Sequence, residues 1–492
     1  MRRCLPALLV LLAVWAPVAS AADSGFPALQ ALRSEGAAVS AMAVSLPDGR
    51  PLWSLDARRR LSPASITKLY TAAAVLDHWG PNGTFTTRLL AASRPSDSTV
   101  DGDLVFLGAG DPALTEERLW ELGARLRDAG VTRVTGDLII NQSRFGAVPC
   151  LTSDRCRARE STNEAYNAPL SAAGVNYGTW CTLIAPASHS GQPARTRFCS
   201  FDLPSMDLHG RVRTTGEGDS PKLRVTRDTA GGRDRIAVAG SIPVDSDAVR
   251  VYRSVSNAAR HTGIIFRRIL SLLGVHVVGD VVVANKRPPD SLHRIAAVDS
   301  LSISEQIRRM LTFSNNYMAD TLALDLLADD SGADTTRPLT LPRAGAHLAE
   351  LGRSLSAPVG EGGDSPVVLL SGSGLTDGNR VSGADVVALL RGIYGRPDLF
   401  PSFLGALTVP RYSPLSIMEG DNPAWMTRIA AKTGSMFDPV TVLGVAGYFR
   451  TRDGGWGAFA MIINGRGPTS NLSYGRGMKA LRKDVGTLLS RY

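Results

Sequence analysis

Three segments of the chain repeat one short pattern, Val-x-Gly-Asp followed by three apolar residues. The copies begin at Val100, Val134 and Val277. Each copy has the form of a turn that leads into a strand, and apolar spacing predicts amphipathic helices before the second and third copies, around 115–128 and 257–273. We therefore expect one α/β domain with a weak internal repeat. Because the third copy lies far along the chain from the second, we expect a further domain nested between them.

The segment between these two copies, 161–255, has the pattern of short strands and is expected to form a mostly β domain. Four cysteines lie in it or just before it: Cys150, Cys156, Cys181 and Cys199. In an exported protein, an even local cluster predicts two disulfides, for which three pairings are possible. We favour Cys150–Cys156 with Cys181–Cys199. Zinc is the weaker alternative, because the spacings are not pairs of Cys-x-x-Cys and no histidine lies between Cys150 and Cys181.

The two ends of the chain both show strand patterns. Near the N-terminus, residues 37–46 and 51–56 flank Pro-Asp-Gly-Arg, which is the signature of a β-hairpin. Near the C-terminus, before a final helix around 477–490, three segments alternate like meandering strands: 427–433, 440–450 and 456–464. These five strands predict one antiparallel sheet covered by helices, with the region between them as an insertion.

The expected fold class is therefore α+β and multi-domain. A five-stranded antiparallel sheet flanked by helices carries a large α/β insertion, which itself contains the nested, mostly β domain. The expected boundaries are 1–21 for a signal peptide, 22–85 and 296–492 for the outer domain, 86–160 and 256–295 for the inserted α/β domain, and 161–255 for the nested domain.

The first residues have the features of a secretory signal. Arg2 and Arg3 supply a positive start, an apolar run follows from Leu5 to Val14, and Ala19-Ser20-Ala21 fits a cleavage site. The alternative, a membrane anchor, is less favoured because the run is too short to cross about 30 Å of hydrocarbon. We expect cleavage, export to the periplasm, and at most peripheral association with the membrane.

The charge pattern narrows the expected partners. The net charge of +9 is a mild excess that suits an acidic substrate or envelope surface. No dense basic run with interleaved aromatics is present in the sequence, so nucleic acid is not an expected partner. Of the 54 Lys and Arg residues only six are lysine. A lysine here marks a place that needs a compact amine, or one that can lose its proton, which directs attention to Lys68 and Lys432.

A Ser-x-x-Lys motif, Ser65 to Lys68, stands at the start of an apolar helix expected over 65–78. The spacing puts both side chains on one helix face. A capping box would place an acid at the position of Lys68, and the positive helix end disfavours an ammonium there. The positive end of the helix and burial among apolar residues are both expected to lower the pKa of Lys68. A neutral amine can then take the proton of Ser65. The alternative is that Ser65 is only a helix cap.

A second polar motif, Ser314-Asn315-Asn316, interrupts a helix that starts at the expected capping box Ser302-x-x-Glu305. Ser314 can relay a proton, and Asn316 can hold either a substrate amide or Lys68. The alternative is a polar turn between two helices.

A third motif, Lys432-Thr433-Gly434-Ser435, ends the first late strand. Lys432 offers a positive charge, and Thr433 and Ser435 offer hydroxyls for a carboxylate. Gly434 is expected to leave room for a substrate backbone. The alternative is an ordinary strand end followed by a turn.

Taken together, Ser-x-x-Lys, Ser-x-Asn and Lys-Thr-Gly occur in the order typical of penicillin-recognising serine enzymes. Within that superfamily, the sequence resembles the D-alanyl-D-alanine carboxypeptidase/endopeptidase family S13, the class C low-molecular-mass penicillin-binding proteins. Departures are small, with Ser371 where Asp is usual and Ser435 where Thr is common. Further matching segments are Gly108-Ala-Gly-Asp-Pro112, Tyr166-Asn-Ala-Pro-Leu-Ser171 with Val175-Asn176, and Ser371-Gly-Ser-Gly-Leu375 with Asn379-Arg380.

This resemblance implies a penicillin-binding/β-lactamase-like outer domain that acts on peptidoglycan peptides without metal or cofactor. Ser65, activated by Lys68, would attack the carbonyl between two D-alanines, and the backbone N–H groups of Ser65 and Ser435 would stabilise the oxyanion. Ser314 would pass a proton to the departing amine. The substrate would be held by Asn316 at the acyl-side amide and by Lys432, Thr433 and Ser435 at the terminal carboxylate. β-Lactams would mimic the dipeptide and leave a slow acyl-enzyme.

Two other functions compete with this interpretation. A serine β-lactamase is disfavoured by Ser314, which stands where one class uses Tyr, and by an insertion that the compact class lacks. A non-catalytic protein that senses penicillin or binds the cell wall is disfavoured by the intact pair of Ser65 and Lys68.

Overall fold

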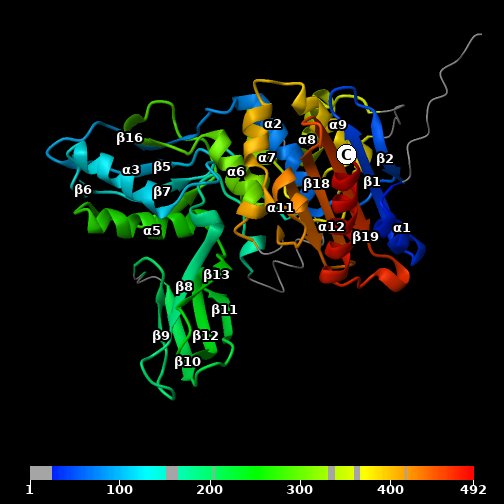
Figure 1. Ribbon diagram of the computed structural model, residues 1–492. Coiled ribbons are helices and arrows are strands. Elements are labelled where there is room, and N and C mark those ends of the chain that lie inside the picture. Colours follow the sequence, from blue (N-terminus) through cyan, green and yellow to red (C-terminus); the bar gives the residue numbers. More distant parts are fainter. Residues whose placement is uncertain are drawn as a thin grey trace, which may run out of the picture.

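The computed structural model describes residues 25–492 except for 151–163, 202, 204–205, 331–337, 360–365 and 416–417. The predicted signal peptide and Cys156 lie outside the described residues. Figure 1 shows a helix-rich body at one side, an α/β part beside it, and a group of strands that projects away from both. In the part of the chain that is described, no helix combines the length and the apolar character that crossing a bilayer requires.

A five-stranded antiparallel sheet joins the two ends of the chain, as predicted. Its strand order is β17-β18-β19-β1-β2, and β1 pairs with β19 along its whole length, from Ala38 opposite Asn464 to Ser45 opposite Gly457. The N-terminal hairpin therefore completes the C-terminal meander. The strands are β1 (Ala38–Ser45), β2 (Pro51–Leu55), β17 (Ile429–Met436), β18 (Val442–Arg450) and β19 (Trp456–Asn464).

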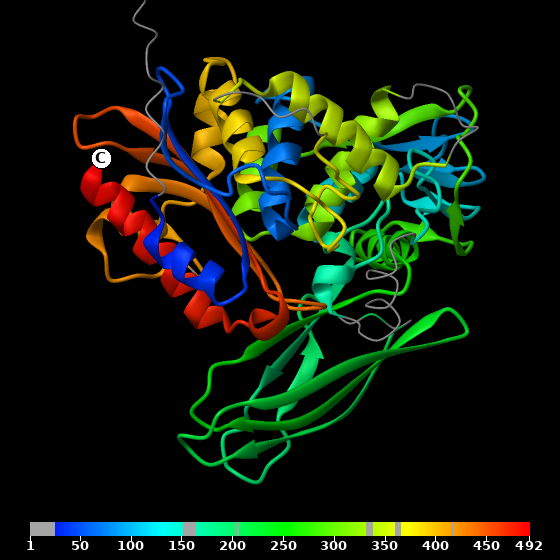
Figure 2. The ribbon, with the colours of Figure 1, turned by 90° about the vertical axis from the view of Figure 1, so that its right-hand side faces the viewer.

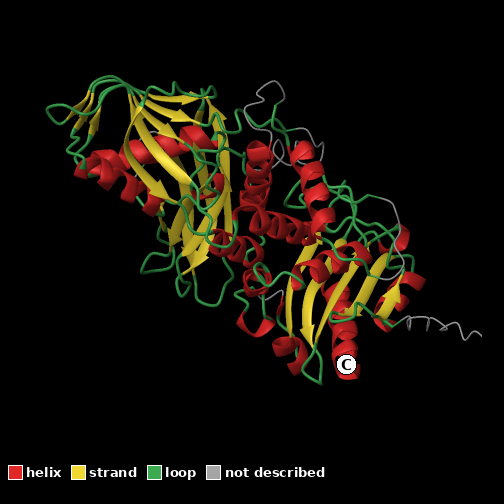
Figure 3. Ribbon diagram, turned by 90° about the horizontal axis from the view of Figure 1, so that it is seen from above, coloured by secondary structure: helices red, strands yellow, loops and turns green. Residues whose placement is uncertain are grey.

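Helices cover both faces of this sheet, and each face has its own apolar core. One face packs against α1 (Pro27–Ser34), α11 (Pro423–Arg428) and α12 (Tyr474–Arg491). Seen from above, other helices lie between this sheet and the second strand-rich part of the molecule (Figure 3). The helices of the other face are α2 (Lys68–Trp79), α6 (Ile303–Thr312), α7 (Asn316–Asp330), α8 (Leu341–Leu355), α9 (Gly383–Tyr394) and α10 (Phe400–Ala406).

The helix α2 is buried nearly all round, as its sequence predicts, from Lys68 to Leu76. The predicted capping box of α6 is only half formed. The Ser302 hydroxyl accepts a hydrogen bond from the backbone N–H of Glu305, but the Glu305 carboxylate instead accepts hydrogen bonds from Arg308 and Arg309. Two nearby guanidinium groups outcompete a single backbone N–H because charge-assisted hydrogen bonds are stronger.

The three Val-x-Gly-Asp segments each connect a short strand to a longer one. The short strands pair in parallel in the order β14-β6-β4, and the longer ones belong to a sheet of order β15-β7-β5-β3-β16. The helices α3 (Glu116–Asp128) and α5 (Ala258–Leu272) precede the second and third copies, as predicted. The strands are β3 (Thr86–Ala91), β4 (Thr99–Val100), β5 (Leu104–Leu107), β6 (Arg133–Val134), β7 (Leu138–Asn141), β14 (His276–Val277), β15 (Val281–Ala284) and β16 (His293–Asp299).

The Gly-Asp turns of the repeat stack on one another. The carboxylate of Asp103 accepts a hydrogen bond from the backbone N–H of Asp137 at 2.8 Å, and that of Asp137 accepts one from Asp280 at 2.7 Å. A Cβ at Gly136 would lie 2.5 Å from the carbonyl carbon of Gly102. The repeat therefore needs glycine for close stacking and aspartate to bond the next turn.

The nested segment forms strands, as predicted, and projects from the rest of the molecule (Figure 2). Its two sheets have the orders β13-β8-β9 and β10-β12-β11, and β10 and β12 run parallel. The strands are β8 (Thr179–Ala185), β9 (Arg195–Phe198), β10 (Asp207–Thr215), β11 (Lys222–Ala230), β12 (Arg233–Pro243) and β13 (Val249–Ser254).

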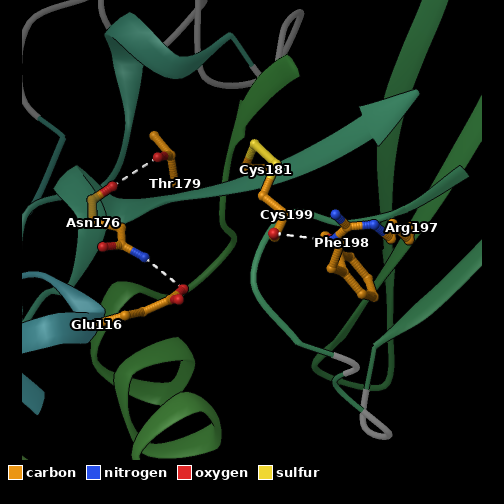
Figure 4. The surroundings of a disulfide bond; sticks show 7 residues. All are labelled: Glu116, Asn176, Thr179, Cys181, Arg197, Phe198 and Cys199. Atoms are coloured by element: carbon orange, nitrogen blue, oxygen red, sulfur yellow. Dashed lines mark hydrogen bonds between the residues drawn. A yellow bond between two sulfur atoms is a disulfide. The ribbon is translucent and has the colours of Figure 1, made fainter. Parts of the chain in front are cut away.

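A disulfide joins Cys181 of β8 to Cys199, just after β9 (Figure 4). This is the pairing that we favoured, so these two sulfurs are not zinc ligands. Cys150 is also disulfide-bonded, but the predicted partner, Cys156, is not among the described residues.

Replacing Cys181 and Cys199 together by serine should loosen the sheet that contains β8 and β9. The bond links residues 18 apart in the sequence. In the chain-entropy model, removing such a bond lowers the free energy of unfolding by about 3 kcal/mol, because the unfolded chain gains conformational freedom. Hydrogen exchange of the β8 and β9 amides measures the effect, and wild type treated with a reductant is the control. Unchanged amide protection in the variant would contradict this prediction.

Candidate active site

Ser65 lies on a 3₁₀ turn, Ala64–Thr67, rather than on the first turn of the α-helix that we predicted from residue 65. The α-helix begins at Lys68, and its N-cap is Thr67, so the interpretation of Ser65 as a simple helix cap is wrong. The turn is sharp because Ala64 has a φ of 46°, in the left-handed region that non-glycine residues avoid. Strained backbone of this kind often accompanies functional sites. Ser65 is half-buried, so its hydroxyl remains accessible.

Lys68 is fully buried and its amine lies among three oxygens. Nζ lies 2.9 Å from Ser65 Oγ, 2.7 Å from Asn316 Oδ1 and 2.7 Å from the carbonyl oxygen of Ser373. The amide and carbonyl oxygens can only accept hydrogen bonds, whereas the serine hydroxyl can also donate one. A neutral amine has two N–H groups for the two acceptors and one lone pair for the hydroxyl proton. An ammonium would instead donate to all three oxygens, so the geometry accommodates both protonation states of Lys68.

Ser314 marks the break between α6 and α7. Its φ of 53° is left-handed, which ends one helix and turns the chain into the next. Its hydroxyl accepts a hydrogen bond from Lys432 Nζ at 2.9 Å. The structure thus brings together the second and third motifs, as well as the first and second through Lys68 and Asn316.

Lys432 is 3% exposed, and its Nζ also donates to the carbonyl oxygen of Thr433 at 2.6 Å. From the sequence we expected a positive charge at this position, on a lysine that marks a place needing either a compact amine or one able to lose its proton. Burial lowers the pKa of Lys432 to about 7, because the ammonium form loses its hydration. The charge at this site is therefore sensitive to pH in the neutral range.

Asn316, the first residue of α7, connects the motifs to the insertion. Its Oδ1 accepts from Lys68, and its Nδ2 donates to the backbone carbonyl of Tyr166 at 3.2 Å. Tyr166 belongs to a short 3₁₀ turn of the inserted region, Ala165–Asn167. The contact with Lys68 is one of the two that we predicted for Asn316. The contact with Tyr166 was not predicted, because nothing in the sequence pairs these positions.

Gly434 is required for close packing of β17 against the turn of Ser65. A Cβ at this position would lie 2.6 Å from the carbonyl oxygen of Pro63 and 3.2 Å from the backbone nitrogen of Ile66. The glycine therefore lets β17 lie directly against the turn that carries Ser65. Thr433 and Ser435, which flank it, are half-buried.

A partly buried ionic cluster fixes α7 against the insertion, and no motif in the sequence predicts it. Arg144 of the insertion donates to Asp325 and Asp329 of α7. A Cβ at Gly110 would clash with the Asp325 carboxylate at 2.0 Å, which explains the glycine before Asp111. Burial raises the pKa of Asp111 to about 7 and also raises that of Asp325. These contacts hold the helix that carries Asn316.

The serine hydroxyl contacts a buried lysine, and its turn packs between a helical layer and the edge of a five-stranded antiparallel sheet. This arrangement defines the class of penicillin-binding and β-lactamase-like serine enzymes. The family model described as "D-Ala-D-Ala carboxypeptidase 3 (S13) family" matches residues 27–485. The chain belongs to this family of serine-type D-Ala-D-Ala carboxypeptidases.

Individual relatives agree with this assignment. A D-alanyl-D-alanine carboxypeptidase from Actinomadura sp. strain R39 is 33% identical over 369 residues, which cover 72% of this chain and 64% of that enzyme. The carboxypeptidase DacB from Haemophilus influenzae is 22% identical over 88% of this chain and 86% of its own. A crystal structure of penicillin binding protein 4 (dacB) from the same organism superposes with a TM-score of 0.73 at 20% identity, covering 94% of this chain and 99% of that one. The fold is thus the α+β fold that we predicted.

Proposed function

We propose that the protein is an exported serine peptidase, a carboxypeptidase, an endopeptidase or both, that cleaves D-alanyl bonds in peptidoglycan stem peptides through an acyl-enzyme on Ser65. The observation that carries the proposal is the 2.9 Å contact between Ser65 Oγ and the buried amine of Lys68. Family membership supplies the substrate class. The related carboxypeptidase from Actinomadura supports the same reaction.

In the proposed reaction, Lys68 takes the hydroxyl proton of Ser65 while Oγ attacks the carbonyl carbon of the penultimate D-alanine. The backbone N–H groups of Ser65 and Ser435 stabilise the negative oxygen of the tetrahedral intermediate. The C–N bond then breaks, and Ser314 passes a proton to the departing amine. Water hydrolyses the resulting ester and releases the shortened peptide.

Substrate binding is proposed for the remaining residues of the motifs. Lys432, Thr433 and Ser435 bind the terminal carboxylate, and Gly434 keeps them close to Ser65. Asn316 holds Lys68 in position and, by exchanging its contact with Tyr166, binds the acyl-side amide of the substrate. β-Lactams acylate Ser65 by the same route. In support, the penicillin binding protein 4 of Haemophilus influenzae has also been solved in complex with a β-lactam.

We also propose the location and the domain division that the sequence predicts. Cleavage after residue 21 delivers the protein to the periplasm, with at most peripheral membrane association. The catalytic domain comprises 22–85 and 296–492, the inserted α/β domain 86–160 and 256–295, and the nested domain 161–255.

Mass analysis of muropeptides after digestion tests the proposed function. Pentapeptides that lose the mass of one alanine report carboxypeptidase activity, and cross-linked dimers that become monomers report endopeptidase activity. Digestion with the Ser65→Ala variant is the control for contaminating hydrolases. If the wild-type protein produces neither change, the proposal is wrong.

The buried amine of Lys432 should make kcat/KM fall at alkaline pH. Its pKa is lowered to about 7, so the amine is charged below that pH and neutral above it. Because the charged form binds the substrate carboxylate, kcat/KM should fall as the pH rises through about 7. The profile of kcat/KM reports groups of the free enzyme.

The Lys432→Arg variant is the matched test of this pH dependence. A guanidinium stays charged throughout the accessible range. The variant should not show the fall of kcat/KM above pH 7, even if its overall rate is lower. If the same fall persists in Lys432→Arg, another group is responsible for it.

A further inference from the structure

A cavity of about 730 Å³ lies outside the catalytic motifs, between α5 and the strands of the nested segment. Figure 1 shows α5 next to the point from which these strands project. The lining comes from the start of β12 and the glycine before it, from one side of α5 along most of its length, and from the start of β15. Its volume falls within the range of small-molecule sites in proteins, about 300–1,000 Å³.

The cavity is rich in arginine. Arg233, Arg260, Arg267 and Arg268 all line it. Arg267 donates to the carbonyl oxygen of Val277. The side chains of the other three form no hydrogen bond or ion pair within the described part of the chain, and the Nε atom of Arg268 is buried without a partner there. Arg233 and Arg260 are exposed, so water hydrates their guanidinium groups, whereas Arg268 is half-buried. A buried donor such as Arg268 Nε is costly to leave unsatisfied, and the cluster of positive charges favours an anionic ligand.

The acidic residues at the cavity do not neutralise these arginines. Asp234 accepts hydrogen bonds from Thr229 Oγ1 and from the backbone N–H of Ser256, and lies 3.4 Å from Arg227. Asp280 is almost fully exposed and lies 4.0 Å from Arg267.

A buried histidine adds a second kind of contact. His261 lines the cavity, is 4% exposed, and its Nε2 has no hydrogen-bond partner among the described residues. Burial lowers the pKa of His261 to about 4, and its ring donates to the backbone of Thr179. The ring is therefore neutral at pH 7, and Nε2 is an acceptor. A ligand for this cavity has to offer a hydroxyl or N–H donor as well as negative charge.

We propose that this cavity binds a polyol phosphate, that is, a phosphate ester with free hydroxyl groups. Three unpaired guanidinium groups have more donors than the two oxygens of one carboxylate can accept, whereas a phosphate monoester offers three strong acceptor oxygens. A free hydroxyl of the polyol donates to His261 Nε2. A soluble polyol phosphate is a monoester with three free phosphate oxygens, and the headgroup of a glycerophospholipid such as phosphatidylglycerol is a diester with two. Both present a phosphate together with free hydroxyl groups. The site is separate from Ser65 and independent of the proposed reaction.

Calorimetric titration of the full-length protein with glycerol 3-phosphate tests the proposal. We expect saturable binding by wild type, and binding weakened at least about tenfold in both Arg260→Gln and Arg268→Gln, since each removes one charge-assisted contact. Arg287→Gln is the matched control, because Arg287 is 76% exposed and lies outside the cavity. It should bind like wild type. Penicillin acylation should be unchanged in all three variants, which verifies that they are folded.

Two further probes sharpen the assignment. D-Glycerate, which carries a carboxylate in place of the phosphate, should bind at least about tenfold more weakly than glycerol 3-phosphate. Vesicles that contain phosphatidylglycerol distinguish the lipid source from the soluble one, with phosphatidylcholine vesicles as the control. Arginine-dependent binding of either the soluble ester or the vesicles supports the proposal. It is overturned if wild type binds neither, if both cavity variants bind like wild type, or if glycerate binds equally well.

Discussion

The Ser65→Ala variant should lose covalent labelling by a fluorescent penicillin, and its release of D-alanine should fall by at least about 10⁴-fold. Removal of a nucleophile eliminates the acyl-enzyme pathway rather than slowing one step of it. The variant should still fold, because Ser65 is half-buried and its hydroxyl contacts the amine of Lys68 rather than capping the helix. Intact mass spectrometry after incubation with penicillin measures the covalent adduct directly.

The matched control for this experiment is Ser34→Ala. Ser34 is exposed at the end of α1, where its hydroxyl donates to the carbonyl oxygen of Gln30. This variant should label like wild type. An adduct of full stoichiometry on Ser65→Ala would show that another residue is the nucleophile, and peptide mapping of the adduct would then locate it.

The second large effect is expected for Lys68→Met. The substitution keeps a long apolar stem but removes the proposed base, which should slow acylation by penicillin by about 10²–10⁴-fold. It also leaves Asn316 Oδ1 and the Ser373 carbonyl without the amine that contacts them, so some loss of stability is expected as well. Stopped-flow fluorescence measures acylation, and thermal unfolding measures stability separately.

Two variants separate the base function of Lys68 from its packing and charge. Lys479→Met removes an exposed lysine of α12 and should change neither measurement. Lys68→Arg keeps a cation but cannot provide a neutral amine, so it should acylate as slowly as Lys68→Met. If Lys68→Arg acylates at the wild-type rate, Lys68 supplies charge rather than proton transfer, and the proposed mechanism fails at its first step.

Several parts of the fold could be predicted because they depend on local pattern. Short apolar runs between turn signals indicate buried strands, as in β1 and β19, and the three Val-x-Gly-Asp segments predict a repeated turn. The boundary of α2 was less predictable. A 3₁₀ turn and an α-helix share almost the same side-chain spacing over one turn, so Ser65 could not be assigned to one of them in advance.

The candidate site was predictable as a set of residues but not as an arrangement. Ser65, Lys68, Ser314, Asn316 and Lys432 were chosen from the order of short motifs. The structure decided which of them meet: Lys68 and Asn316 are 248 residues apart in the chain, and Lys432 and Ser314 are 118 apart. The motifs offered Lys68 as one possible partner of Asn316, but local pattern does not fix such distant pairs, because they depend on how whole elements pack.

The amino-acid sequence by itself determined the order of the elements, the interruption of one domain by another, and the residue types available for chemistry. These follow from periodicity and local turn preferences, which act over a few residues. Only the tertiary structure decided that Cys181 pairs with Cys199, that Gly434 makes room for the turn of Ser65, and that Lys432 is buried deeply enough to lower its pKa to about 7. Each of these depends on the distance between distant segments and on the exclusion of water, and both arise only when the elements pack together.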